Sequence, residues 1–470
     1  MLYYWQGRKP GPCHSTQVVR DTICAISTPP GIGGIAVLRV SGPDAVNIVA
    51  KILYPPVKAE KFKPNTLFHS FIKDPDKDEI LDEAVISFMK APHSYTGEDV
   101  VEISVHGGRL VPKLILELLI KQGARLAEPG EFTKRAFLNG KLDLIQARSV
   151  LDLIEARSRR GVRIALEKLR GKLSRRLEEL RDKLLYLLKE IEARVEFEED
   201  VPPLDETKLK EELIYVKNLI DKYVEEGERG ALYFEGIEIA IVGKPNVGKS
   251  TLFNKLLRYE RAIVTPYAGT TRDVISEEII IEGVPVKLHD TAGIRETREL
   301  IESIGIERAK RVATSAHLVL FVIDASQEID EDDINLWNLL EGERILVLNK
   351  IDLGIKVDLS KLKNADRFKT YLISCITGEG LEELETGIKE DIHQNVEVGG
   401  EFALSQRERA LLLEAGQEIA SAIQGLGGIP LDLISFHVSM SLRKLNEIFG
   451  IENIPEEILN SIFKDFCIGK

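Results

Sequence analysis

A short stretch near the middle of the chain combines the residue types that hold nucleotide phosphates. It reads Gly243-Lys-Pro-Asn-Val-Gly-Lys249-Ser250, and it lies between an apolar run at 237–242 and a helical pattern. In such a GxxxxGKS loop, backbone N–H groups of the loop and of the helix N-terminus surround phosphate oxygens. Lys249 would bind the β- and γ-phosphates as a catalytic residue, and the Ser250 hydroxyl would bind Mg²⁺. The stretch therefore predicts a nucleoside triphosphate site with contacts from Asn246, Val247, Gly248, Lys249, Ser250 and Thr251.

Four further motifs follow the loop in order and indicate which base is bound. Gly269-Thr-Thr offers hydroxyls for Mg²⁺, and Asp290-Thr-Ala-Gly offers a carboxylate for the metal and an amide for the γ-phosphate. The carboxylate of Asn349-Lys-Ile-Asp352 can accept hydrogen bonds from guanine N1–H and the 2-amino group, a donor pair that adenine lacks. This order of motifs favours GTP. The predicted contacts are Thr270, Thr271, Asp290, Thr291, Ala292, Gly293, Asn349, Lys350, Asp352, Ser374, Cys375 and Ile376, with Ser250 and Thr271 on Mg²⁺.

Motif spacing alone leaves open how the attacking water is activated. Ras-like enzymes carry a Gln after the Asp-x-x-Gly motif, whereas this chain has Ile294 there. Asn246 could bind a monovalent cation beside the phosphates and so supply the charge of an arginine finger, or it could only order its own loop. Glu296, Glu299 and Glu302 follow the motif, and each could polarise water or belong to a solvated helix start.

Composition restricts the class of protein. The chain has 470 residues, of which 44% are hydrophobic and 30% charged, so several folded domains are expected and a largely disordered chain is excluded. The formal net charge of −13 excludes a globally basic nucleic-acid binder. No apolar run reaches the roughly 18 residues that span a membrane, and the four cysteines form no CxxC pair. These features predict a cytoplasmic protein with no membrane contact.

The hydrophobic pattern of the first third predicts an α+β domain. Residues 1–20 show no period and are expected to form an extension outside the fold. Alternation at 34–41 and 99–106 predicts strands. The first strand places Arg39 on the same face as Ile35 and Val37, and the second places Glu102 opposite three valine and isoleucine side chains.

The rest of the chain predicts a helical domain with a second domain inserted in it. After about residue 142 the apolar spacing becomes three and four, and a stripe from Leu166 to Val195 predicts one long helix. Helical patterning returns from Gln406, and Pro455 is expected at the first position of the last helix. Between these blocks, 236–392 alternates strands and helices in the βαβ rhythm of a parallel sheet.

Nine basic side chains gather within 157–176, where only Glu167 opposes them. This cluster could contact RNA phosphates or an acidic partner, or it could be a solvated face over an inward apolar stripe. Its members are Arg157, Arg159, Arg160, Arg163, Lys168, Arg170, Lys172, Arg175 and Arg176.

Outside the nucleotide motifs, several short sequences resemble the tRNA modification GTPase MnmE (TrmE) family over about residues 21–470. They are Thr28-Pro-Pro-Gly, Leu38-Arg-Val-Ser-Gly, Tyr95-Thr-Gly-Glu-Asp-Val, His106-Gly-Gly, Pro129-Gly-Glu-Phe, Arg135-Ala-Phe-Leu-Asn, Lys141-Leu-Asp-Leu and the terminal Phe466-Cys-Ile-Gly-Lys. The resemblance implies an N-terminal α+β tetrahydrofolate-binding and dimerisation domain (21–138), a discontinuous all-α helical domain (139–232 and 395–470) and an inserted Ras-like P-loop GTPase domain with a mostly parallel sheet (233–394).

The resemblance also implies an activity. With the FAD-carrying flavoprotein MnmG, in a heterotetramer, the family adds a carboxymethylaminomethyl or aminomethyl group to C5 of the wobble uridine of tRNA. The carbon comes from a tetrahydrofolate derivative in its methylene or formyl form. Two alternatives stay open: a ribosome-assembly or other RNA-timing GTPase without folate chemistry, and a folate one-carbon transferase that GTP only regulates.

Site residues of the family map onto this chain residue by residue. The resemblance implies that K⁺ is bound by Asn246, Thr265, Tyr267 and Thr270, and that Thr265 also contacts the nucleotide. It further implies that two GTPase domains close on each other in the homodimer and that Glu302 orients the water. It implies a folate site at Arg39, Glu102, Lys141 and Lys470, where a carboxylate suits the pterin and cations suit the glutamyl carboxylates. Cys467 would lie near this site if the last helix folds back; it could be a redox or catalytic thiol or a packed small residue.

Overall fold

The structure is a computed structural model that describes residues 21–197, 199, 202–259, 275–281, 283–290, 316–340, 342–396, 401–451 and 455–470. The predicted extension at 1–20 lies outside these residues. The described residues form two compact units. One unit contains those of 1–151, 168–220 and 410–470, and the other contains 152–167 and those of 221–409.

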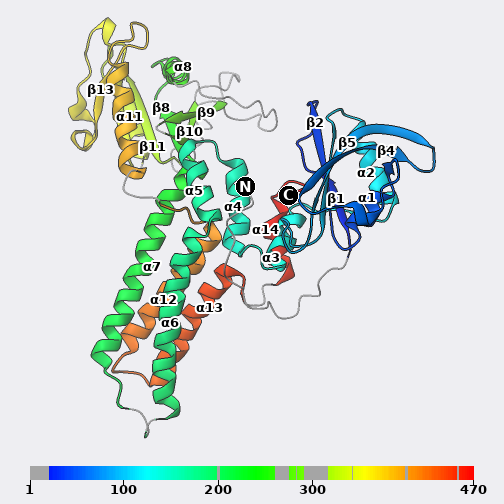
Figure 1. Cartoon of the computed structure of the whole chain (residues 1–470). Helices are drawn as coiled ribbons and strands as arrows, with labels where there is room; N and C mark the ends of the chain where they lie inside the picture. The colour runs from blue at the N-terminus through cyan, green and yellow to red at the C-terminus, as the bar shows by residue number, and fades with distance from the viewer. Residues whose placement is uncertain are drawn as a thin grey trace. The chain divides into compact units, whose positions relative to one another are not determined.

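A seven-stranded sheet forms the N-terminal part of the first unit, in the order β3-β4-β5-β6-β2-β1-β7 (Figure 1). All neighbours are antiparallel except β1 and β7. The strands predicted at 34–41 and 99–106 are present as β2 and β6, which pair directly. The strand bounds are β1 (Ile23–Ile26), β2 (Ile35–Ser41), β3 (Leu53–Tyr54), β4 (Thr66–Asp74), β5 (Glu79–Met89), β6 (Val100–His106) and β7 (Arg125–Leu126).

One face of this sheet carries the core. Its inward side chains, such as Leu38 and Ile103, pack with Val49 of α1 (Ala45–Ala50) and Leu119 of α2 (Val111–Lys121). Burying alternate strand residues against amphipathic helices removes apolar surface from water, at about 25 cal/mol per Å². The opposite face holds Arg39 and Glu102. Two further short helices of this part are η1 (Ala59–Lys61) and α3 (Glu131–Leu138).

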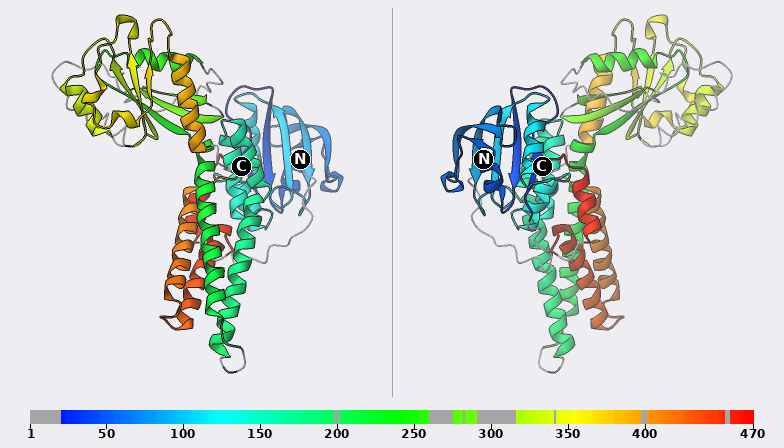
Figure 2. Two further views of the ribbon diagram at one scale, coloured as in Figure 1. Left: turned by 90° about the vertical axis from the view of Figure 1, so that its left-hand side faces the viewer. Right: turned by 90° about the vertical axis from the view of Figure 1, so that its right-hand side faces the viewer.

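The helical part of the first unit contains long helices that pack through leucine and isoleucine side chains. α6 (Lys172–Glu196) lies beside α13 (Leu431–Phe449), as Figures 1 and 2 show. The remaining helices that contribute to this unit are α4 (Leu144–Glu155), α7 (Glu206–Glu235), α12 (Gln406–Gly425) and α14 (Glu456–Lys464).

The prediction of a single long helix over 166–195 is wrong. The chain forms α5 (Arg159–Leu169) and then α6, because Gly171 between them adopts a left-handed φ of 78° that ends one helix and precedes the next. Pro455 caps α14 from the residue before its first turn and is not itself the first helical residue.

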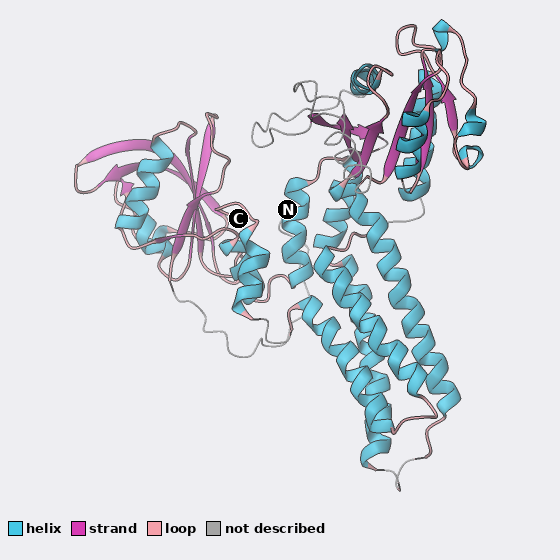
Figure 3. Cartoon of the chain, turned by 180° about the vertical axis from the view of Figure 1, so that it is seen from behind, coloured by secondary structure: helices cyan, strands magenta, loops and turns pink. Residues whose placement is uncertain are grey.

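The second unit contains a six-stranded sheet in the order β13-β12-β11-β8-β10-β9, which is parallel except for β9. Figure 3 shows its strands with helices alongside. β8 (Ile237–Val242) runs over the predicted residues, and the sheet lies in the sequence between α7 and α12, so the inserted, mostly parallel domain is confirmed. The other elements are α8 (Lys249–Tyr259), β9 (Ile275–Ile281), β10 (Val284–Asp290), β11 (Leu318–Asp324), α10 (Glu331–Leu339), β12 (Arg344–Asn349), η2 (Ile351–Leu353), η3 (Leu359–Lys361), η4 (Ala365–Arg367), β13 (Thr370–Leu372) and α11 (Leu381–Val396).

Among the described helices, none combines the length and the apolar character needed to cross a membrane.

Candidate functional sites

The glycine-bounded loop joins β8 to α8 at the carboxyl edge of the parallel sheet. Gly243 and Gly248 have positive φ angles of 157° and 104°, and Asn246 is left-handed at 63°. A Cβ on Gly248 would lie 2.1 Å from Asn349 Nδ2. That amide nitrogen donates to the Val247 carbonyl over 2.8 Å. The loop therefore packs directly against the end of β12, which only a glycine at this position allows.

Lys249 and Ser250 occupy the first two positions of α8. The Lys249 ammonium donates to the carbonyls of Gly243 and Lys244 over 2.7 and 2.6 Å, and the residue is 6% exposed. The lysine thus lies across the loop whose N–H groups would hold phosphate. A helix N-terminus with a lysine and a hydroxyl fits a triphosphate with its magnesium ion.

The base-binding motifs meet at the ends of β12 and β13. Ser374 Oγ donates to Asp352 Oδ1 over 2.6 Å, and the Cys375 N–H donates to Asn349 Oδ1 over 3.1 Å. Asp352 is exposed, so its second carboxylate oxygen is open to a guanine. Burial raises the pKa of Cys375 to about 11, which keeps this thiol neutral. Ile376 is 78% exposed.

Sequence reasoning missed three ion pairs that hold these motifs. Lys350, left-handed at φ 67°, donates to Asp324 Oδ2 over 2.7 Å. Burial would raise the pKa of Asp324, but hydrogen bonds from Lys350 and Ser326 lower it. Lys244 of the loop pairs with Asp330, 2.6 Å away, and with the buried Asp333, 2.8 Å away. The available signal was that Asp324 ends a fully apolar strand at the same sheet edge.

Part of the predicted nucleotide site lies outside the described residues. This holds for the second Mg²⁺ ligand, three of the four predicted K⁺ ligands and all water-activating candidates, and for Asp290 only the backbone is described. The residues outside are Thr265, Tyr267, Thr270, Thr271, Thr291, Ala292, Gly293, Glu296, Glu299 and Glu302.

The second candidate site is built on the open face of the N-terminal sheet, where Arg39 of β2 and Glu102 of β6 are register partners. Arg39 Nε and one terminal nitrogen donate to the same oxygen, Glu102 Oε1, over 2.9 and 2.7 Å. Within the described residues, Glu102 Oε2 accepts no hydrogen bond. The guanidinium carbon of Arg39 also lies 5.5 and 5.6 Å from the ring centres of Tyr95 and Phe132.

The C-terminal tail reaches this pair. The Gly469 carbonyl accepts hydrogen bonds from Arg39 over 3.3 Å and from Ser27 Oγ over 3.1 Å. Burial and the charge of Arg39 lower the pKa of Lys470, against opposing effects of Cys467 and Glu102. Cys467 is a free, exposed cysteine, and its carbonyl accepts from the Gly130 N–H over 3.4 Å. The C-terminal tail that carries Cys467 therefore folds back so that its Gly469 carbonyl contacts Arg39.

Lys141, the fourth residue assigned to this site, contacts the loop that follows β5. Its ammonium donates to the Pro92 carbonyl over 2.9 Å, and a Cβ on Gly97 would meet its side chain. It is thus linked to the loop 94–98, which also carries Tyr95, and it does not join Arg39 and Glu102 directly.

Some side chains of the basic cluster at 157–176 make contacts within the protein. Arg157 pairs with Glu278 of β9, and Arg160 stacks over Tyr233. Lys168 is only 1% exposed. Lys168 is therefore held within the fold and Arg157 is paired at the surface with an exposed glutamate, so the cluster offers fewer free charges for an external phosphate than the sequence indicates.

Comparisons with known proteins agree with this geometry. The family model for the N-terminus of the GTP-binding protein TrmE matches residues 22–141, and the model for the MnmE helical domain matches 144–467. The chain is 44% identical to the tRNA modification GTPase MnmE of Thermoanaerobacter pseudethanolicus and 45% identical to that of Aquifex aeolicus. Each alignment covers 96% of this chain and 100% of the relative. The chain belongs to the tRNA modification GTPase MnmE family.

Proposed function

We propose that this GTPase acts in the cytoplasm with a flavoprotein of the MnmG type, in a heterotetramer, to add a carboxymethylaminomethyl or aminomethyl group to C5 of the wobble uridine of tRNA. The observation that carries the proposal is that one chain holds two sites. One is a phosphate loop with Asp352 nearby, a carboxylate that suits guanine, and the other is the Arg39–Glu102 ion pair, which the C-terminal tail contacts. A GTPase that only times RNA assembly has no need of the second site.

The nucleotide site would act as follows. Ser250 and Thr271 would hold Mg²⁺, which neutralises the charge that develops on the phosphates. Lys249 would leave the loop carbonyls for the β- and γ-phosphates. Asp352, held by Ser374, would accept the two guanine N–H donors.

A potassium ion fits the donor set assigned to it. Asn246 carries an amide oxygen in a constrained left-handed position of the phosphate loop, and Thr265, Tyr267 and Thr270 would add oxygens. The ion would bring positive charge to the β–γ bridge when two GTPase domains close. Glu302 would orient the attacking water.

The folate site is supported by the free oxygen of Glu102. Because Arg39 uses only Oε1, Oε2 can accept a hydrogen bond from the N–H or amino group of a pterin. Arg39, Lys141 and Lys470 would serve the glutamyl carboxylates. The tetrahydrofolate, in its methylene or formyl form, supplies the carbon, and FAD on the partner supplies the redox step. Cys467 is a candidate thiol at this site.

A homodimer is supported by the open sheet face. Leu67 is 71% exposed, Val85 43% and Phe71 37%, and all three lie on the face that also carries Arg39 and Glu102. An apolar strand surface of this kind is a normal dimer interface.

The test compares GTP turnover in potassium and in sodium. We expect potassium to stimulate wild-type turnover by about tenfold or more, because the ion supplies charge at the transition state. Asn246→Ala should lose the stimulation. The matched control is Asn364→Ala, which removes another left-handed asparagine, at φ 59°, from η4. Equal wild-type rates in the two salts would refute the cation mechanism and favour a GTPase that an external partner activates.

A further inference from the structure

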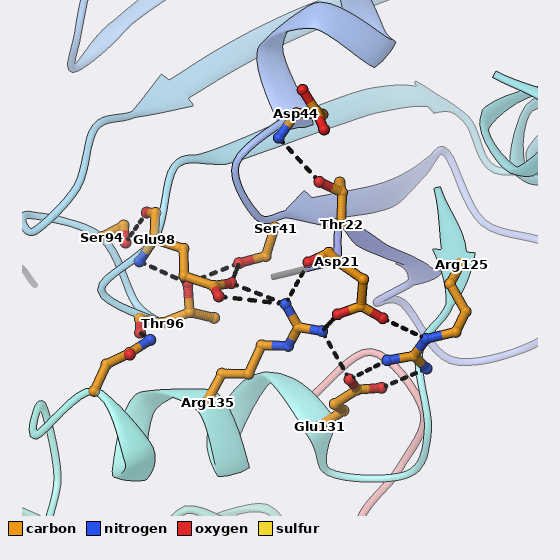
Figure 4. A network of polar contacts seen from close by, with 11 residues as sticks. Asp21, Thr22, Ser41, Asp44, Ser94, Thr96, Glu98, Arg125, Glu131 and Arg135 are labelled. Atoms are coloured by element: carbon orange, nitrogen blue, oxygen red, sulfur yellow. Dashed lines mark hydrogen bonds and ion pairs between the residues drawn. The ribbon is translucent and has the colours of Figure 1, made fainter. Parts of the chain in front are cut away.

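Arg135 of α3 is the centre of a buried polar network that no part of the proposed chemistry uses (Figure 4). The side chain is 6% exposed. It donates to Asp21 Oδ1 over 2.6 Å, to Glu131 Oε1 over 2.9 Å and to both oxygens of Glu98 over 3.3 Å. Burial would lower the pKa of Arg135, but the charge of Glu98 and hydrogen bonds to Glu131 and Asp21 raise it, so the arginine stays charged. Arg125 donates to Asp21 and Glu131 and closes the network.

Glu98 connects the Arg135 network to the loop 94–98, of which it is the last residue. Ser41 Oγ donates to Glu98 Oε2 over 2.7 Å and lies 2.7 Å from Thr96 Oγ1. The amide of Asn139, at the end of α3, donates to the Thr96 carbonyl over 2.8 Å. Ser41 and Thr96 are fully buried. The loop is therefore fixed from β2 on one side and from α3 on the other.

The loop in turn places the ring of Tyr95 against the guanidinium of Arg39. The Tyr95 hydroxyl lies 2.9 Å from Thr133 Oγ1 of α3, and its ring covers the Arg39 guanidinium. The second ring over Arg39 is Phe132, also from α3. α3 thus supplies both the anchor of the loop and one wall of the Arg39–Glu102 site.

The desolvation cost of these charged groups indicates that the network fixes the positions of side chains more than it adds stability. Burying the Arg135 guanidinium with the carboxylates of Glu98 and Glu131, whose side chains are at most 15% exposed, carries a large desolvation cost, and apolar residues of equal volume would often give the same stability. Hydrogen-bonded charges do fix distances and directions, and they reject alternative packings. Tyr95 must be held in one position if it is to orient a charged, partly exposed arginine.

We propose that Arg135 and Glu98 are positioning residues that lock Tyr95 over Arg39 and so set the affinity of the Arg39–Glu102 site for a folate. Neither residue touches the ligand. The inference rests on the folate site proposed above and adds residues that control it.

The test measures the dissociation constant of 5-formyltetrahydrofolate for the full chain by calorimetry. Glu98→Gln removes the charge that faces Arg135 at nearly constant shape and should weaken binding about tenfold, and Tyr95→Leu should have a similar effect. In the Tyr95→Leu background, Glu98→Gln should add less than about twofold, because the route to Arg39 is already broken. A purely structural role would give effects that multiply.

Controls separate failure of this inference from failure of the folate site. Asp76→Asn breaks an exposed ion pair with Lys121 in the same domain and should bind as wild type does. If Glu98→Gln does not fold, Tyr95→Phe keeps the ring, loses the Thr133 hydrogen bond and should weaken binding several-fold. Wild-type affinity in Glu98→Gln, or multiplying effects in the double variant, would overturn the positioning role while leaving the folate site in place. No binding by wild type, or equal binding by Glu102→Gln, would overturn both.

Discussion

At the scale of single residues, the guanine selectivity that we propose rests on one exposed carboxylate, Asp352, whose position a buried serine fixes. Asp352 offers two acceptor oxygens, and Ser374 holds one of them over 2.6 Å. An asparagine there offers one acceptor and one donor, which matches xanthine, with its N1–H and 2-oxo group, and does not match guanine.

Asp352→Asn should therefore change the preferred substrate from GTP to xanthosine triphosphate. We expect GTP turnover at subsaturating nucleotide to fall roughly 100-fold, the effect of losing about 2–3 kcal/mol of charged hydrogen bonding. Turnover of xanthosine triphosphate should rise by a comparable factor. Asp358→Asn, which changes the cap of η3, is the matched control and should leave both rates unchanged. Unaltered GTP preference in Asp352→Asn would mean that another group reads the base.

The sequence predicted such residues well where a motif places them next to one another in the chain. The loop at 243–250 and the Asn349-Lys-Ile-Asp352 motif are local, and their strands follow from apolar runs. Asp324, Asp330 and Asp333 were missed because their lysine partners are distant in sequence and nothing local marks the pairing. Lys350 lies 26 residues from Asp324, and Lys244 lies 86 and 89 residues from Asp330 and Asp333. The Arg39–Glu102 pair was predicted in part. Alternation in each strand assigned the face on which each residue lies, but only the β2–β6 register brings the two residues together.

At the scale of elements, α3 contacts segments of the first unit that are far apart in the sequence, from Asp21 to α14. Its N-cap, Gly130, is left-handed at φ 66°, and a Cβ there would lie 2.8 Å from the Phe463 carbonyl of α14. Lys134 donates to Asn460 over 2.7 Å. Glu131 accepts from the Glu128 N–H, which precedes the helix, and from two arginines. Propensity alone did not predict these contacts, because each depends on an element distant in sequence.

Glu131→Gln should destabilise this part of the chain by about 2 kcal/mol at pH 7, since it leaves two guanidiniums with one carboxylate fewer in a buried network. Burial would raise the pKa of Glu131, but hydrogen bonds from Arg125, the Glu128 N–H and Arg135 lower it below its ordinary 4.5. A lowered folded-state pKa means that the stabilisation is complete above pH 4.5 and is lost as the pH falls through the folded value.

The difference in thermal midpoint between wild type and Glu131→Gln should therefore be largest near neutral pH and should narrow as the pH falls below 4.5. Scanning calorimetry of both proteins at several pH values measures it. Glu117→Gln, at an exposed position of α2, should match wild type throughout. A difference that stays constant down to pH 3 would show that the Glu131 charge is not what stabilises α3.

At the scale of the whole molecule, the proposed dimer depends on the open face of the N-terminal sheet. Leu67→Asp places a charge among exposed apolar side chains and should halve the molar mass measured by light scattering. Ile120→Asp is the control: it changes a 41% exposed residue on α2, which covers the other face, and should remain dimeric. A dimer unaffected by Leu67→Asp would place the interface elsewhere.

The central claim is that GTP hydrolysis and the Arg39–Glu102 site act in one reaction on tRNA. The most direct measurement is the mass of the wobble nucleoside after incubation of tRNA with this chain, its flavoprotein partner, methylene-tetrahydrofolate and GTP in potassium. We predict the modified uridine with wild type. A non-hydrolysable GTP analogue and the Glu102→Gln variant should yield none, although that variant should still hydrolyse GTP. Equal product with the analogue or with Glu102→Gln would contradict the account.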